Sequence, residues 1–147
     1  MIVCSAILFS RNFMYDYQRV IGVSMMETTE ENDIIIINKM IKNYDKKDII
    51  VLKDSKNNLV VKRIIALPGE SISCEEGDIY INDKKIVEDY IVGETQSFKK
   101  IKLKSNEYFV MGDNRENSID SREYGPIQKE EIIGKVIKII EKKDSKI

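Results

Sequence analysis

The sequence predicts a mostly β domain, built from short antiparallel strands with a β-hairpin extension. Ile and Val dominate the apolar residues of this 147-residue chain, and β-branched residues favour strands over helices. Turn residues recur between short apolar runs, and no segment has the periodicity of a long helix. The length suits a single domain with its own core.

The expected strands are short and closely spaced. β-branched and alternating runs predict them at residues 33–38, 48–53, 59–67, 100–104, 107–111 and 132–140. Residues 17–25 alternate only weakly. Residues 77–87 alternate on either side of Asn82-Asp83, which predicts a hairpin. The polar stretch 71–75 is not assigned to a strand, and residues 90–97 and 112–126 are expected to be loops.

The complete absence of histidine limits the chemistry of any catalytic site. It excludes every Ser-His-Asp and Cys-His arrangement and removes the commonest zinc ligand. We therefore expect no metal and no cofactor, and a hydrolytic site would need Lys, Asp, Glu or Tyr as its base. The formal net charge of −1 gives no reason to expect a nucleic-acid partner.

The N-terminal segment is an apolar run from Met1 to Phe9 without a charged residue. Such a run is too short to cross a bilayer core, which takes about 20 helical residues. It is either a buried element of the domain or the C-terminal end of a membrane anchor. Cys4 in this run and the distant Cys74 have very different surroundings in the sequence, so no disulfide is expected.

Three stretches are unlike ordinary β architecture. In the first, Gly22 precedes Ser24, and a serine in such a turn can present its hydroxyl and its backbone N–H to one carbonyl. In the second, Lys62 lies among β-branched neighbours. A lysine withdrawn from water can titrate several units below about 10.4 and can then accept a serine proton.

The third stretch is residues 112–122, which combine two Asp and two Arg with polar side chains. Asp and Arg can form bidentate pairs that rigidify a loop without a core. A serine hydroxyl in this loop could also hold a neutral lysine in line. Each of the three stretches on its own is more often an ordinary loop or strand, and only their combination indicates a catalytic site.

Together, the three stretches resemble the bacterial type I signal peptidases, Ser-Lys enzymes that remove signal peptides from exported proteins. The family's Ser-Met-x-Pro-Thr motif appears here as residues 24–28, and its Gly-Asp-x-Val motif appears as residues 32–35. Its lysine motif appears as residues 61–70, and its C-terminal motif appears almost whole as residues 112–122. The resemblance covers about residues 8–138.

The resemblance implies a role for each matching position. Ser24 would attack the scissile carbonyl, and Lys62 would act as general base and then as acid for the leaving amine. Ser118 would orient Lys62. The charged residues implied to brace the loop behind them are Asp113, Asp120 and Arg122. The residues implied to line apolar pockets for small substrate side chains are Val20, Ile21, Met25, Val60 and Val61.

The resemblance also implies where the protein acts. Residues 1–10 would be the end of a truncated transmembrane anchor, residues 11–140 the peptidase domain, and residues 141–147 a charged tail. We expect a monomer in the cell membrane, single-pass, with its catalytic domain on the extracytoplasmic side. Its partners would be the signal peptides of preproteins and membrane lipid.

Three departures from the family pattern leave alternatives open. Some relatives have a serine hydroxyl where this chain has Gly22, so the Ser24 N–H is the one oxyanion donor that the resemblance supplies. Glu27 replaces a proline and Asn32 replaces a glycine. A non-catalytic paralogue that binds signal peptides is therefore an alternative. A self-cleaving regulatory domain like the SOS repressors is another, although the chain has no recognisable DNA-binding segment.

Overall fold

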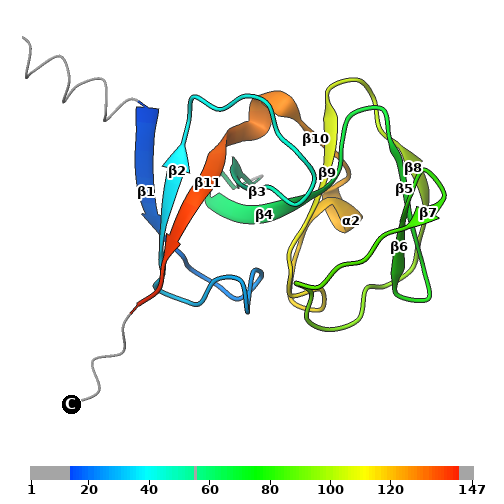
Figure 1. The fold of residues 1–147 in the computed structure, drawn as a ribbon, viewed down its shortest axis with the longest axis horizontal. Coiled ribbons are helices and arrows are strands. Elements are labelled where there is room, and N and C mark those ends of the chain that lie inside the picture. Colours follow the sequence, from blue (N-terminus) through cyan, green and yellow to red (C-terminus); the bar gives the residue numbers. More distant parts are fainter. Residues whose placement is uncertain (1–13, 55, 143–147) are drawn as a thin grey trace, which may run out of the picture.

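Two antiparallel sheets form the fold, and they lie side by side in Figure 1. The computed structural model describes residues 14–54 and 56–142. The larger sheet has seven strands in the order β1-β2-β11-β3-β4-β9-β10. Their bounds are Tyr15–Arg19 (β1), Ile34–Asn38 (β2), Ile132–Ile140 (β11), Ile49–Lys53 (β3), Leu59–Ala66 (β4), Glu107–Met111 (β9) and Ile127–Gln128 (β10).

The smaller sheet has four strands in the order β7-β6-β5-β8. Their bounds are Lys84–Lys85 (β7), Asp78–Ile81 (β6), Ser71–Glu75 (β5) and Phe98–Lys102 (β8). Two short helical elements complete the described chain. They are α2, Ser121–Tyr124, and the 3-10 turn η1, Lys129–Glu131.

Alternating side chains on β3, β4 and β9 build three apolar clusters. Ile50, Leu52, Ile64 and Val110 belong to one cluster, and Ile35, Ile37 and Val51 belong to another. Phe109 and Met111 of β9 pack with the smaller sheet. Because successive strand residues point to opposite faces, neighbouring residues of β3 serve different clusters. The central strands of the larger sheet therefore have an apolar cluster on each face.

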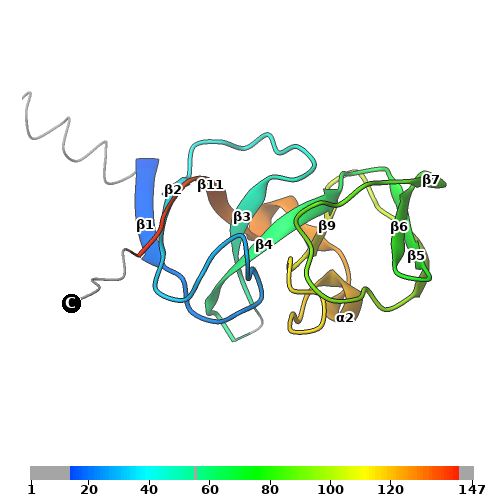
Figure 2. The ribbon, with the colours of Figure 1, turned by 60° about the horizontal axis from the view of Figure 1, so that its bottom comes forward.

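Strand β4 has an incomplete set of neighbours. It pairs with β3 over its first five residues, from Leu59 to Arg63. On its other edge, pairing with β9 begins only at Arg63. Residues 59–62 therefore have one edge without a ladder partner among the described strands, and Figure 2 shows this part of β4 projecting away from β9.

The predicted fold class is confirmed, but three local predictions were wrong. Residues 71–75 form β5, because Ile72 and Cys74 are buried between β6 and β8 while the intervening serine gave the stretch a polar composition. Strand β8 spans Phe98–Lys102, so it begins and ends two residues before the strand expected at residues 100–104. The expected loop 112–126 contains the four-residue helix α2, which Asp120 caps by accepting from the Arg122 N–H.

The expected anchor, residues 1–10, lies outside the described residues, as does most of the tail 141–147. In the part of the chain that the structure describes, no helix has the length and apolar character needed to cross a membrane.

Candidate active site

Ser24 lies in the turn that follows β1, and the loop after β9 holds this turn in place. The Asn114 N–H donates to the Ser24 carbonyl (2.9 Å), and the Asn114 side-chain amide donates to the Val23 carbonyl (3.2 Å). The Val20 N–H donates to the Asp33 carbonyl (2.8 Å), which ties the start of the turn to the segment entering β2. The position of Ser24 is thus set by two distant segments.

Gly112 allows the Ser24 turn and the 112–118 loop to approach closely. A Cβ at this position would overlap the Ser118 hydroxyl and would lie 2.5 Å from the Ser24 carbonyl oxygen. Real Cβ atoms do not approach heavy atoms this closely, so any larger residue would push the two serines apart. The glycine is needed here for space, not for its backbone conformation.

Lys62 is a buried lysine whose amine faces the same loop. The residue is 4% exposed, and its Nζ donates to the Ser118 Oγ at 3.0 Å. Burial lowers the Lys62 pKa from 10.5 to about 8, although the nearby Asp120 carboxylate opposes this shift. A useful fraction of the amine is therefore neutral near pH 8 and can act as a base.

Ser118, Asp120 and Arg122 form a hydrogen-bonded chain behind the amine. The Ser118 hydroxyl donates to the Asp120 Oδ2 (2.8 Å), which also accepts from the Gly112 N–H (3.0 Å). Arg122 contacts both carboxylate oxygens of Asp120 at 2.8 Å. Burial alone would raise the pKa of Asp120, but the bonds from Arg122 and Gly112 outweigh it and lower the pKa. Because Ser118 gives its proton to a carboxylate, its oxygen lone pairs face Lys62.

Asp113 joins three segments rather than only bracing the loop. It accepts two bonds from Arg63, from Nε (2.8 Å) and from Nη2 (2.6 Å). It also accepts a bond from the Thr28 hydroxyl (2.5 Å). Arg63 follows Lys62 on β4, and Thr28 lies in the Ser24 turn. The strand with Lys62, the turn with Ser24 and the loop with Ser118 therefore meet at one carboxylate.

Several residues without a predicted role support this loop. Thr28 and Arg63 lie inside the quoted motifs, so their positions could have indicated them. The Arg115 guanidinium bonds Glu88 twice (2.9 and 2.6 Å) and also bonds Thr95 (2.8 Å). Glu88 and Thr95 lie in a segment with no recognisable motif, so no local pattern indicates their contacts with Arg115.

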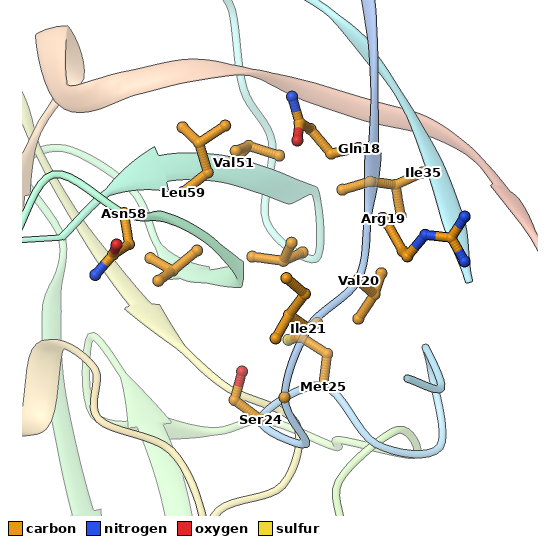
Figure 3. A pocket seen from close by; sticks show the side chains of 13 residues that line it. Gln18, Arg19, Val20, Ile21, Ser24, Met25, Ile35, Val51, Asn58 and Leu59 are labelled. Atoms are coloured by element: carbon orange, nitrogen blue, oxygen red, sulfur yellow. The ribbon is translucent and has the colours of Figure 1, made fainter. Parts of the chain in front are cut away.

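Ser24 lies at the junction of two cavities. The first, about 350 Å³, is formed between the end of β1 and the start of β4. Figure 3 shows the Ser24 hydroxyl directed into it, below Ile21 and Met25. All five residues expected to line an apolar pocket line this cavity: Val20, Ile21, Met25, Val60 and Val61. The second cavity, about 600 Å³, is lined by Ser24 together with Lys62.

The described hydrogen bonds do not include one between the Ser24 hydroxyl and the Lys62 amine, which is bonded to Ser118. They also include none that uses the Ser24 N–H. The site thus combines a hydroxyl, a withdrawn amine facing a shared cavity, and a free backbone donor. Within residues 14–54 and 56–142, no group of His, Cys, Asp and Glu is arranged to hold a metal ion.

The two substituted turn positions both have left-handed backbone conformations. Asn32 has φ 77°, which asparagine tolerates better than most residues and glycine adopts freely. Glu27 has φ 51°. Proline is fixed near −65°, so the turn at Glu27 is not one that a proline could build.

Comparison with known proteins gives one consistent family. The chain matches the family described as "Signal peptidase, peptidase S26" over residues 1–140. It is 37% identical to signal peptidase I U of Bacillus subtilis over 149 aligned residues, covering 90% of this chain and 80% of the relative. It is 37% identical to signal peptidase I of Bacillus amyloliquefaciens over 139 residues, covering 84% and 75%. A crystal structure of signal peptidase I from Enterococcus faecalis matches with a TM-score of 0.59 and 32% identity, covering 65% of this chain and 98% of that one.

Proposed function

Because this chain belongs to the signal peptidase family, peptidase S26, we propose that it removes signal peptides with a Ser24–Lys62 dyad at a membrane surface. Its relatives are signal peptidases I, and the chain is a serine peptidase of that kind. The observation that carries the dyad is the Lys62 amine, which is buried, bonded to Ser118 and lines the same cavity as Ser24.

In the proposed mechanism, the Ser24 hydroxyl gives its proton to the neutral Lys62 amine as its oxygen attacks the scissile carbonyl. The Ser24 N–H donates to the oxyanion that develops. Lys62 then gives the proton to the leaving amine, and the signal peptide stays on Ser24 as an ester. Water, deprotonated by Lys62, hydrolyses that ester and restores the hydroxyl. Ser118 acts as a positioning residue because it accepts a bond from the amine and directs it.

The signal peptide would bind as an added strand. Residues 59–62 of β4 offer an unpaired edge, and extended peptides commonly bind such edges through main-chain hydrogen bonds. The first cavity, beside Ser24, is lined by apolar side chains. It would take the small side chains that precede the cleaved bond, which by convention are P1 and P3.

Action at a membrane surface has its own structural support. Large apolar side chains are exposed around the two cavities, with Ile21 87% and Ile119 70% exposed. Smaller exposures occur at Val23, Met26, Leu59 and Tyr124. An apolar rim of this kind favours contact with lipid over water. We propose that the protein acts as a monomer at the extracytoplasmic face and has no nucleic-acid partner.

Cleavage of a preprotein by the full chain in lipid vesicles tests the dyad. The Ser24→Ala and Lys62→Ala variants should lose all detectable cleavage, and Ser118→Ala should lose most of it. Ser105→Ala and Lys99→Ala change exposed residues of the same types and should cleave normally. Equal cleavage by wild type and both dyad variants would exclude the proposal. Peptide binding without any turnover in the wild type would instead favour the non-catalytic paralogue.

A further inference from the structure

The second cavity has no role in the mechanism beyond containing the reacting groups. It is larger than the first, at about 600 Å³ against about 350 Å³. Apart from the dyad, its lining is largely apolar, with side chains from four segments: Val23, Leu52, Val60, Ile119, Tyr124, Pro126 and Ile127. Besides Lys62, the charged lining residues are Lys53 at the end of β3, Asp54 and Lys56 in the β3–β4 connection, and Glu131 in η1.

The two cavities lie on opposite faces of β4. Val61 pairs with Val51, and both belong to the apolar cluster below the first cavity. The next pair, Val60 with Leu52, packs into the cluster of the opposite face. Leu52 and Lys62 line only the second cavity, whereas Val51 and Val61 line only the first. Val60 borders both cavities, which meet at this edge of the strand. The unpaired edge of β4 therefore has one cavity on each side of it.

A strand added to this edge must alternate between the two faces, because successive side chains of a strand point in opposite directions. If P1 and P3 enter the first cavity, the side chain between them, P2, points to the opposite face. We propose that the P2 side chain enters the second cavity and that this enzyme prefers a large apolar or aromatic residue there. This inference rests on the proposed function, and it concerns a separate subsite that binds neither the P1 nor the P3 side chain.

The lining of the cavity identifies the class of side chain. Ile119 is 70% exposed and Tyr124 is 45% exposed, so both have apolar surface available to cover a P2 residue. The cavity also runs beside Val60, at the level of the β4 edge where P2 would lie. A glycine at P2 would leave this surface in water. A phenylalanine or leucine would bury it, which is favourable in proportion to the area covered.

A peptide series tests the subsite. The peptides keep Ala at P1 and P3 and vary P2 through Gly, Ala, Leu and Phe; a second series varies P1′ instead. We expect kcat/KM to rise about tenfold or more from Gly to Phe at P2, with little change across the P1′ series. Ile119→Ala and Tyr124→Ala should each reduce the Phe-to-Gly ratio several-fold. Val87→Ala changes an equally exposed apolar residue away from both cavities and should keep the ratio.

The outcomes separate this inference from the dyad. If wild type cleaves all P2 peptides at equal rates, or if only the P1′ series changes the rate, the P2 subsite is excluded while the dyad stands. An unchanged ratio in both cavity variants would also exclude it. If no peptide is cleaved, or if Ser24→Ala cleaves as well as wild type, the proposed function fails and the subsite fails with it.

Discussion

Arg63 and Asp113 form a two-point ion pair that joins the strand carrying Lys62 to the loop carrying Ser118. The guanidinium contacts the carboxylate through Nε at 2.8 Å and through Nη2 at 2.6 Å. Arg63 is 8% exposed and Asp113 is fully buried. Because Thr28 also donates to Asp113, this one pair controls how the Ser24 turn, the Lys62 strand and the Ser118 loop fit together.

Replacing Asp113 by Asn should therefore destabilise the protein as well as reduce its activity. Removing one partner of a buried pair leaves the other charge uncompensated, which typically costs about 3–5 kcal/mol. Urea unfolding of wild type and Asp113→Asn measures this cost. Asp78→Asn removes the carboxylate of the exposed pair with Lys85, and it should cost under about 1 kcal/mol. Similar small losses in both variants would contradict a structural role for the Arg63–Asp113 pair.

The sequence was most informative where a strand had a strongly apolar pattern. The runs that became β2, β3, β4, β9 and β11 were predicted within about two residues, because β-branched side chains favour strands. It was least informative where burial came from partners distant in sequence. In β5, Ile72 and Cys74 are buried only because β6 and β8 flank them, and nothing in the local composition indicates those neighbours.

In the site, too, residues within recognisable motifs could be predicted, whereas contacts between distant segments could not. Residues inside long motifs could be recognised as a group, and the structure brings Lys62, Ser118, Asp120 and Arg122 into one connected arrangement. The contact between Arg115 and Glu88 could not be predicted, because it joins residues 27 positions apart without a shared pattern. The left-handed conformation at Glu27 was also unexpected, since glutamate has no preference for it.

The pH dependence of cleavage should follow the protonation of Lys62. Only the neutral amine accepts the Ser24 proton, so activity should rise with pH and reach half its maximum near pH 8, where the lowered pKa lies. The Asp120 carboxylate raises the Lys62 pKa, so Asp120→Asn should shift the midpoint of its residual activity to lower pH. Profiles of kcat/KM from pH 5 to 10 measure both. A flat wild-type profile would argue against a lysine base.

Lys62 should lower the stability of the folded protein, because its amine is buried. Its pKa falls from 10.5 to about 8 on folding, so the folded state binds fewer protons between these values and stability rises with pH across this window. Below pH 8 the full destabilisation is present. We expect Lys62→Met to be inactive yet about 1–3 kcal/mol more stable at pH 6, with the difference shrinking as the pH approaches 10. Urea unfolding at the two pH values tests this sign, and a less stable variant at pH 6 would refute it.

The turn after Ser24 should respond in opposite directions to two substitutions at Glu27. Its φ of 51° is unfavourable for any residue with a Cβ, and glycine adopts it without that cost. Glu27→Gly should therefore stabilise the protein by up to about 1 kcal/mol. Glu27→Pro restores the residue that the family motif has, but it should destabilise this chain because proline cannot take a positive φ. Thermal unfolding of both variants, with the exposed Glu31→Gly as a control for the loss of a surface carboxylate, measures the difference. If the proline variant were the more stable of the two, the turn would have to adopt a different backbone from the one described here.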